Sequence, residues 1–346
     1  MGGKVISFFS HKGGVGKTTL TYNIGADLAI HKGKKVLLID ADGQMNLTAN
    51  MFGLSDTVEY SDERDKQWYS TLNKYMNFND FVSGSGTKPI YRYNNGNVPD
   101  NGYVFDLIAA YDLYFELEMR WFEKLNMRYG FDETYEYFSD IVNKINRLKE
   151  EYDFVLIDCS PSATSVLNAF LVLISDFFVS PVRSDFFSYQ AIGRLLNIVT
   201  NWQNLFGPVQ GYRTGINMVP KFLGLIVNGT KKTDASGGIS KASQMWAKAV
   251  NSCLNQKFTY SGYCISVADF KKYFSGSQSN PYIISAQTVE CAKNVKSVAD
   301  KLGLPLVLMT ARHYSALGGV AKNNYRTNLN RFCEAVRYVA DCFTKL

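Results

Sequence analysis

The sequence predicts an α/β fold, a doubly wound and mostly parallel sheet with helices on both faces. Short apolar runs such as Val5–Phe9 and Lys35–Ile39 alternate with segments whose apolar residues recur every three or four positions over most of the 346 residues. Continuous apolar runs are typical of strands buried on both faces, and the segments between them are long enough for crossover helices. Such alternation favours parallel strands joined by helices. We expect a single domain over residues 1–346.

A glycine-rich loop separates the first apolar run from the first helical segment. Residues 11–19 read His-Lys-Gly-Gly-Val-Gly-Lys-Thr-Thr, and Leu20 and Ile24 follow at helical spacing. Glycines let backbone N–H groups close around phosphate oxygens, and the helix N-terminus adds partial positive charge. Lys17 is placed to reach the β- and γ-phosphates, and Thr18 to bind Mg²⁺. Strand, loop and helix together predict a phosphate-binding loop rather than a turn with solubilising lysines.

Aspartates follow two of the apolar runs. The run Lys35–Ile39 ends in Asp40, with Asp42 two residues later, and the run Phe154–Ile157 ends in Asp158 in the manner of a Walker B strand. The carboxyl ends of parallel strands beside a phosphate loop are where Mg²⁺ and an attacking water are held. An acidic helix cap is the alternative for the first pair, and it is the weaker one beside residues 11–19.

The remaining elements continue the alternation. We expect strands over 103–108, 177–182, 222–228 and 305–309, and helices over 113–125 and 133–150. The last helix carries an apolar stripe through Phe332, Val336, Val339, Phe343 and Leu346, which predicts a docked core helix.

Residues 56–102 differ from the rest of the chain. They are polar and glycine-containing, they show little periodicity, and they carry several aromatic side chains. We interpret this segment as an insertion within the domain, either a partner-binding excursion or a long surface loop outside the core strands.

Composition narrows the class of protein. With 46% hydrophobic and 20% charged residues, the chain is an ordinary globular protein with a large core. Its six cysteines are scattered and form no C-x-x-C, which disfavours a zinc ribbon, a redox pair and a metal-cluster carrier and fits a reducing cytoplasm. Residues 221–346 hold 17 Lys and Arg against 6 Asp and Glu, a net of +11, whereas residues 1–220 hold 20 against 25. This asymmetry indicates a polyanionic partner, or else a scattered solvated surface.

The motifs resemble those of the ParA/MinD family of ATPases with a deviant Walker A loop, and most closely its ParA-type partition ATPases. The second lysine of the loop, Lys12, marks the family, and residues 40–46 resemble its D-x-D-P-Q-x-N switch, with Gly43 in place of the proline. That replacement is expected to loosen the turn. Ser160–Ser162 resembles the second switch. The resemblance covers about residues 3–55 and 103–230, and the C-terminal third more weakly.

The resemblance implies a P-loop NTPase fold and a function. The family hydrolyses ATP with Mg²⁺, forms an ATP-dependent sandwich homodimer in which Lys12 would reach the partner's nucleotide, and binds DNA without sequence preference. A ParB-like partner stimulates hydrolysis, and the cycle positions plasmids, chromosomes or other cargo. The resemblance assigns catalytic roles to Lys12, Lys17 and Asp42, nucleotide contacts to Lys12, Gly13, Gly14, Val15, Gly16, Lys17, Thr18, Thr19 and Asn228, and metal contacts to Thr18, Asp40 and Asp158.

The assignment of Asn228 leaves an alternative. Asn228 would read the adenine edge, since an amide both donates and accepts, but a turn asparagine after a strand also fits. Family members place DNA-contacting residues in the C-terminal region, and Lys322, Arg326 and Arg331 are the candidates here, which would make the protein nucleoid-associated.

Two other functions stay open. One is a MinD-like ATPase acting on a membrane surface, although the last helix pairs Glu334 with Arg337 and so lacks the strongly basic face that membranes select. The other is a binding module that keeps its nucleotide without turning it over.

Overall fold

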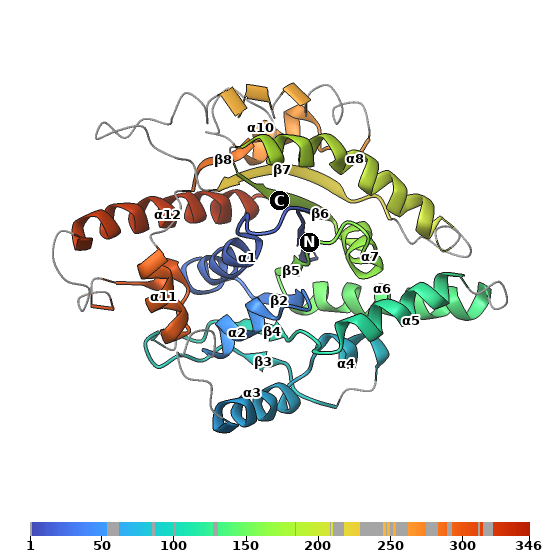
Figure 1. Ribbon diagram of the computed structural model, residues 1–346, viewed down its shortest axis with the longest axis horizontal. Helices are drawn as coiled ribbons and strands as arrows, with labels where there is room; N and C mark the ends of the chain where they lie inside the picture. The colour runs from blue at the N-terminus through green and yellow to red at the C-terminus, as the bar shows by residue number, and fades with distance from the viewer. Residues whose placement is uncertain are drawn as a thin grey trace.

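The computed structural model has an eight-stranded sheet at its centre (Figure 1). It describes residues 2–53, 62–84, 87–99, 101–126, 131–183, 185–207, 209, 218–228, 245–246, 248–249, 252–253, 262–274, 283–288, 293–310, 312–313 and 321–346. The strands run in the order β3-β4-β2-β5-β1-β6-β7-β8, and every described pairing is parallel except β3 with β4. The strands are β1 (Lys4–Phe8), β2 (Val36–Ala41), β3 (Tyr91–Arg92), β4 (Phe105–Ile108), β5 (Phe154–Cys159), β6 (Phe177–Val182), β7 (Lys221–Asn228) and β8 (Ile283–Thr288).

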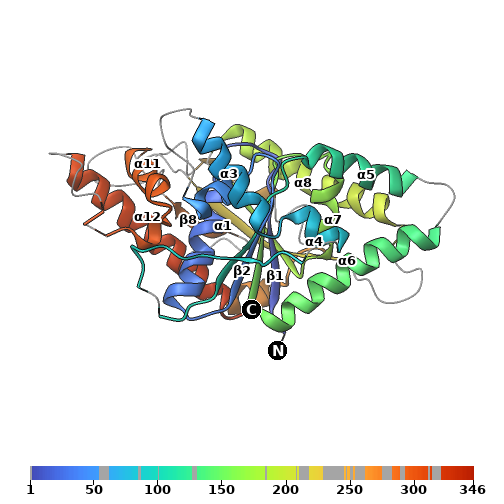
Figure 2. The same cartoon turned by 90° about the horizontal axis from the view of Figure 1, so that it is seen from below.

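Helices cover both faces of this sheet, as Figure 2 shows. On one face lie α1 (Lys17–Ala26), with its π-helical continuation Asp27–His31, α11 (Lys293–Leu302) and α12 (Ala321–Phe343). On the other face lie α4 (Phe78–Ser83), α5 (Tyr114–Asn126), α6 (Phe131–Glu151), α7 (Val166–Ile174) and α8 (Phe186–Phe206). The shorter α2 (Asn46–Phe52), α3 (Asp62–Lys74) and α10 (Val267–Tyr273) complete the described helices. The expected doubly wound, mostly parallel α/β fold is confirmed.

The strands are mostly apolar because the helices exclude water from both faces. Every residue of β2, β4 and β5 is buried, which explains why their sequences are continuous apolar runs instead of alternating ones. On the α5–α8 side the core is aromatic, with the rings of Trp121, Phe138, Phe170 and Phe206 packed at centroid distances of 4.9–5.4 Å. Edge-to-face contacts of this kind add to the burial of the rings.

The strand expected at Pro305–Met309 is wrong. Leu306–Leu308 form a turn of 3₁₀ helix, in which the Leu308 N–H donates to the Pro305 carbonyl at 3.0 Å. The Val307 N–H donates to Asn23 Oδ1 of α1 at 3.1 Å, so side-chain and local bonds replace ladder bonds here. The outer place beside β7 belongs to Ile283–Thr288, which the sequence patterns did not single out. A short apolar run alone could not distinguish a buried turn from a strand.

Residues 76–84 and 87–98 contribute buried side chains to the core, and the expectation that core strands lie outside segment 56–102 is wrong. This stretch supplies α4 and the antiparallel strand β3, and Phe78 and Tyr93 are almost fully buried. Aromatic residues that read as a surface feature in the sequence pack inward, since Tyr93 stacks edge-on against Tyr22 and Phe105. Residues 54–61 lie outside the described part. That the segment is an insertion relative to the family stays a prediction.

The last helix is docked, as its apolar stripe indicates. Phe332, Val336, Val339 and Phe343 of α12 are buried against the sheet and α1. Its polar side is tied to the neighbouring α1 region, because Arg337 pairs with Asp27 at 3.7 Å and Asp341 with Lys32 at 2.5 Å. In the part of the chain that the structure describes, no helix is both long and apolar enough to cross a bilayer.

Tyr93→Ala should lower the free energy of unfolding by about 3 kcal/mol, because it removes a buried ring and leaves a cavity. The matched control is Tyr69→Ala, whose side chain on α3 is 52% exposed and should cost little. Urea unfolding of the two variants and the wild type measures the difference. Equal stability of Tyr93→Ala and wild type would show that segment 76–98 is dispensable for the core.

Candidate functional site

The phosphate loop connects β1 to the first turn of α1. Gly14 and Gly16 have φ of 70° and 90°, a left-handed conformation that suits glycine. A Cβ on Gly16 would also lie 2.1 Å from the Nδ2 atom of Asn228, whereas one on Gly13 or Gly14 would meet nothing within 4 Å. Gly16 is therefore fixed by conformation and by space, while Gly13 and Gly14 leave the loop open toward a ligand.

Asn228, at the end of β7, is hydrogen-bonded to the backbone of this loop. Its Nδ2 donates to the carbonyl of Val15 at 2.9 Å. The described residues that line the cleft do not include it. The bond gives Asn228 a structural role in holding the loop, and the expected adenine contact stays a prediction.

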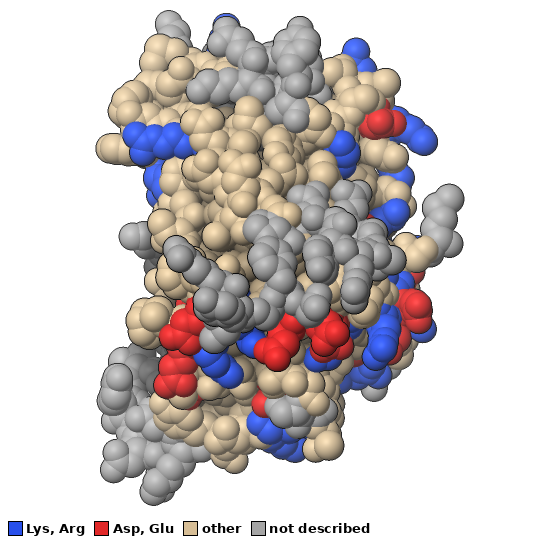
Figure 3. Space-filling view, turned by 90° about the vertical axis from the view of Figure 1, so that its right-hand side faces the viewer, with Lys and Arg blue, Asp and Glu red and all other residues tan. Residues whose placement is uncertain are grey.

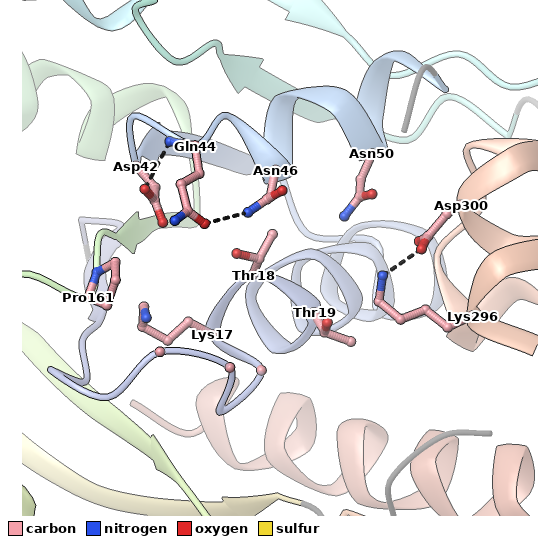
Figure 4. Close-up of a pocket in the computed structure, with 13 residues that line it drawn as sticks. Lys17, Thr18, Thr19, Asp42, Gln44, Asn46, Asn50, Pro161, Lys296 and Asp300 are labelled. Carbon is pink, nitrogen blue, oxygen red and sulfur yellow. Dashed lines mark hydrogen bonds and ion pairs between the residues drawn. The ribbon is translucent and has the colours of Figure 1, made fainter. Parts of the chain in front are cut away.

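A polar cleft of about 420 Å³ opens in front of the loop (Figure 4). This volume falls in the range of small-molecule sites. The lining side chains come from the loop and α1, from the turn after β2, from α2, from the loop after β5 and from α11. The lining residues are Gly13, Gly14, Gly16, Lys17, Thr18, Thr19, Asp42, Gln44, Asn46, Asn50, Pro161, Lys296 and Asp300.

Lys17 is the buried cation of this cleft, with 7% of its surface exposed. Burial lowers the pKa of Lys17, and the nearby carboxylates of Asp158 and Asp42 oppose that shift. A desolvated ammonium that faces a cleft lined by glycine N–H groups is the arrangement that binds a phosphate chain.

Asp40 and Asp158 lie side by side at the carboxyl ends of β2 and β5, where they are paired in register. Both are fully buried. Asp40 is well satisfied: its Oδ2 accepts from the N–H and the hydroxyl of Thr48 at 2.8 and 2.7 Å, and its Oδ1 from the Asp42 N–H at 3.2 Å. Burial nevertheless raises the pKa of Asp40 to about 7, against the effect of these bonds.

Asp158 is not satisfied. Neither of its carboxylate oxygens has a hydrogen-bond partner among the described residues. Burial, and then the charge of Asp40, raise its pKa well above the ordinary range, while Thr18 and Lys17 act in the opposite direction. An orphaned buried carboxylate beside a threonine hydroxyl and a phosphate loop fits a Mg²⁺ ion held partly through water. Thr18 and Asp158 therefore fit the expected metal site directly, and Asp40 shapes it through Thr48.

Asp42 lies in a turn that hydrogen bonds hold closed. Its Oδ1 accepts from the Gln44 N–H at 3.0 Å, and its carbonyl accepts from Met45, which is left-handed at φ 58°. A Cβ on Gly43 would lie 3.0 Å from the Cβ of Tyr114, so the partly buried Tyr114 side chain occupies the space that a larger residue at position 43 would need. Tyr114 thus packs against the turn that Gly43 was expected to loosen.

The second switch is held by Asn168, which sequence reasoning missed. Its Nδ2 donates to the Ser160 and Ser162 carbonyls at 3.0 and 2.7 Å, and its Oδ1 accepts from the Ser160 N–H at 3.1 Å. Asn168 is the polar residue in the apolar helix Val166–Ile174. A polar side chain at such a position needs a hydrogen-bond partner, and this could have been predicted from the sequence.

Comparison with known proteins places this site in a family. A family model described as an AAA domain matches residues 3–208. The sporulation initiation inhibitor protein Soj of Bacillus subtilis is 27% identical over 197 residues, which are 57% of this chain and 65% of Soj. The chain belongs to the AAA domain family, as a ParA/MinD-type ATPase. It spans 54–72% of the length of the first three curated relatives that it matches.

Two solved structures have the same fold. McdA of Cyanothece, in its apo form, superposes with a TM-score of 0.57 at 19% identity, over 96% of this chain and 99% of McdA. The pNOB8 ParA, solved bound to nonspecific DNA, superposes with a TM-score of 0.53 at 19% identity, over 96% of this chain and 98% of that ParA. At such identity the likeness shows the ParA/MinD-type fold alone.

The lysine that marks ParA/MinD-type ATPases is held away from the cleft. Lys12 Nζ lies 2.5 Å from the carboxylate of Asp185 and 5.6 Å from the ring centroid of Phe187. Asp185 also caps α8, accepting from the Ser188 N–H at 2.8 Å. Burial alone would raise the pKa of Asp185, but the bonds from Lys12 and Ser188 outweigh it and lower the pKa.

The candidate DNA residues Lys322, Arg326 and Arg331 lie on α12. Arg326 is exposed and Arg331 half-buried, whereas the side chain of Lys322 lies outside the described residues. Figure 3 draws the α5 and α8 side of the molecule, away from the start of α12, and on that side basic and acidic side chains are interspersed. That the basic C-terminal third forms one patch stays a prediction.

Asp158→Asn should raise the stability of the nucleotide-free protein by about 1–2 kcal/mol, since a neutral amide removes an uncompensated buried acid. Thermal unfolding without nucleotide measures the effect, and Asp112→Asn, at an exposed position, is the control. A destabilised Asp158→Asn would mean that the carboxylate is satisfied in the free protein.

Proposed function

We propose that this chain is a ParA-like, Mg²⁺-dependent ATP hydrolase that positions or segregates plasmid or chromosomal DNA, or other cargo. The observation that carries the proposal is that Lys17 and the glycine loop line one cleft, while the orphaned Asp158 is buried beside it, where its charge acts on Lys17. A desolvated cation for phosphate and a carboxylate without a partner make a site that Mg²⁺ and a nucleoside triphosphate complete.

In this proposal each residue has a separate task. Lys17 binds the β- and γ-phosphates, Thr18 and Asp158 hold Mg²⁺, and Asp42 orients the attacking water. Mg²⁺, when bound, neutralises charge on the phosphate oxygens. The turn at Asp42 and the loop at Ser160 are held by hydrogen bonds to Asp42 and Asn168, which position them beside the phosphate loop.

Dimerisation on ATP would use Lys12. Its bond to Asp185 must open before Lys12 can reach a nucleotide in a second copy. The pair is 24% and 37% exposed at its side chains, where an ion pair contributes little, so a phosphate chain can compete for the lysine.

DNA binding is the part of the proposal that rests on charge. Residues 221–346 carry a net +11, and the structurally similar pNOB8 ParA was solved on nonspecific DNA. Two copies of a weak basic surface in one dimer would bind together and give ATP-dependent affinity. A ParB-like partner would stimulate hydrolysis and release the dimer. The expected location is cytoplasmic, on the nucleoid.

The MinD-like alternative, a membrane-surface ATPase, is less favoured. The polar side chains Arg337 and Asp341 of α12 pair with the α1 region, and its apolar face is buried. This helix is therefore engaged within the fold.

Asp42→Ala should bind ATP and dimerise but hydrolyse it at least about a hundredfold more slowly, because the attacking water loses its orienting carboxylate. Lys12→Ala should also bind ATP, but it should stay monomeric. Single-turnover hydrolysis and light scattering measure the two properties, with Lys17→Ala as the variant that loses ATP altogether. Wild-type hydrolysis rates in Asp42→Ala, or an ATP-dependent dimer of Lys12→Ala, would contradict these roles.

Arg326→Glu should weaken ATP-dependent binding to duplex DNA several-fold and reduce its salt dependence. The variant makes fewer phosphate contacts, so its binding releases fewer counterions. A titration at several salt concentrations compares it with Lys74→Glu, an exposed position on α3 outside residues 221–346. Unchanged affinity of Arg326→Glu would remove α12 from the DNA surface and would favour a test on lipid vesicles.

A further inference from the structure

The far end of the cleft is formed by a helix that none of the sequence motifs includes. Lys296 and Asp300 of α11 line the same cleft as the phosphate loop. Figure 4 shows Lys17 at one end, Thr19 in the middle and Lys296 at the other end. Among the described residues that line the cleft, Lys17 and Lys296 are the two positive side chains.

The end of α11 is fixed by bonds from parts of the chain that are distant in sequence. The Gly303 carbonyl accepts from the hydroxyls of Tyr22 and Tyr93 at 2.9 and 2.7 Å. The Asn95 Nδ2 donates to the Leu302 carbonyl at 2.7 Å. These donors satisfy carbonyls that a helix end leaves open, and so they hold α11 in a set position beside α1.

Close backbone packing adds to this anchor. A Cβ on Gly303 would lie 2.8 Å from the Cα of Gly53 at the end of α2, and both glycines are left-handed. The ends of α2 and α11 therefore touch, and Asn50 of α2 and Lys296 of α11 line the same part of the cleft. The contact between Gly53 and Gly303 therefore fixes the position of α11 relative to α2 at this end of the cleft.

The charged pair itself is directed at the cleft. Lys296 Nζ lies 2.5 Å from Asp300 Oδ2, and the two side chains are 42% and 19% exposed. An i,i+4 pair on a helix surface stabilises the helix by only a few tenths of a kcal/mol. Such a weak pair presents a cation at the cleft and does not prevent it from binding a stronger anion.

We propose that Lys296 is a second phosphate-binding residue of this site, which contacts the sugar-proximal phosphate of the nucleotide, and that Asp300 is the residue that positions it. The inference rests on the proposed nucleotide function. With the terminal phosphate at Lys17, the chain of phosphates leads along Thr19 toward α11, where a cation at the sugar-proximal end completes the charge balance. Asp300 keeps the flexible lysine side chain over the cleft before the nucleotide arrives.

The test is a calorimetric titration of the full chain with ATP and with ADP. Lys296→Ala should raise the Kd of both nucleotides by a similar factor, about tenfold, because both share the sugar-proximal phosphate. Lys271→Ala, which removes an exposed lysine of α10, is the matched control and should leave both values unchanged. Unfolding temperatures of the two variants check that each is folded.

Other outcomes overturn the proposal. Unchanged affinities of Lys296→Ala for both nucleotides would do so. If the same variant also lost affinity for DNA, Lys296 would be assigned to DNA binding instead. A loss confined to ATP would place it on the terminal phosphate. If wild type binds neither nucleotide, or Lys17→Ala binds as well as wild type, the proposed function itself fails, which is a different result from a failure of Lys296 alone.

The positioning role of Asp300 has its own readout. Asp300→Asn should weaken both nucleotides less than Lys296→Ala does, and the double variant should be no weaker than Lys296→Ala, because Asp300 acts only through the lysine. Additive losses would show that Asp300 serves the helix and not the lysine.

Discussion

Two buried carboxylates on neighbouring strands define this molecule. Asp40 and Asp158 are brought into register by the pairing of β2 with β5, directly under the phosphate loop that leaves β1. The fold satisfies one of them, Asp40, through Thr48 and the Asp42 N–H, and leaves the other without a hydrogen-bond partner among the described residues. A buried acid in that condition raises the free energy of the folded state. The site is thus prepared for a cation and destabilised without it, which is a common feature of functional sites.

The surrounding elements keep that arrangement in place and are themselves connected. Thr48 accepts from the Ala110 N–H at 2.9 Å, so the residue that satisfies Asp40 also ties α2 to the end of β4. Tyr22 of α1 and Tyr93 beside β3 both bond to Gly303 at the end of α11. The helix α1, which begins at the phosphate loop, is therefore joined to the antiparallel edge of the sheet and to the C-terminal third.

The sequence was sufficient for the local features and for the class of fold. The loop 11–19, Asp158 and the docked last helix follow from spacing and apolar pattern, which are local properties. The strand at 305–309 was wrong, because a five-residue apolar run has no feature that separates a buried turn from a strand. Segment 76–98 and the pair on α11 were missed for another reason. Their roles depend on contacts between residues about 200 positions apart, such as Asn95 with Leu302, and no periodicity records them. Asn168 lay between these cases, since its polar side chain stands out in an apolar helix.

The most direct measurement is the affinity of the wild-type chain for ATP with Mg²⁺ and with a chelator. If Asp158 holds a metal ion, removing Mg²⁺ leaves the negative triphosphate close to a buried carboxylate. The Kd of ATP should then rise by at least about tenfold. Equal affinity in the two conditions would mean that Asp158 holds no metal and that the acidic pair serves the fold alone.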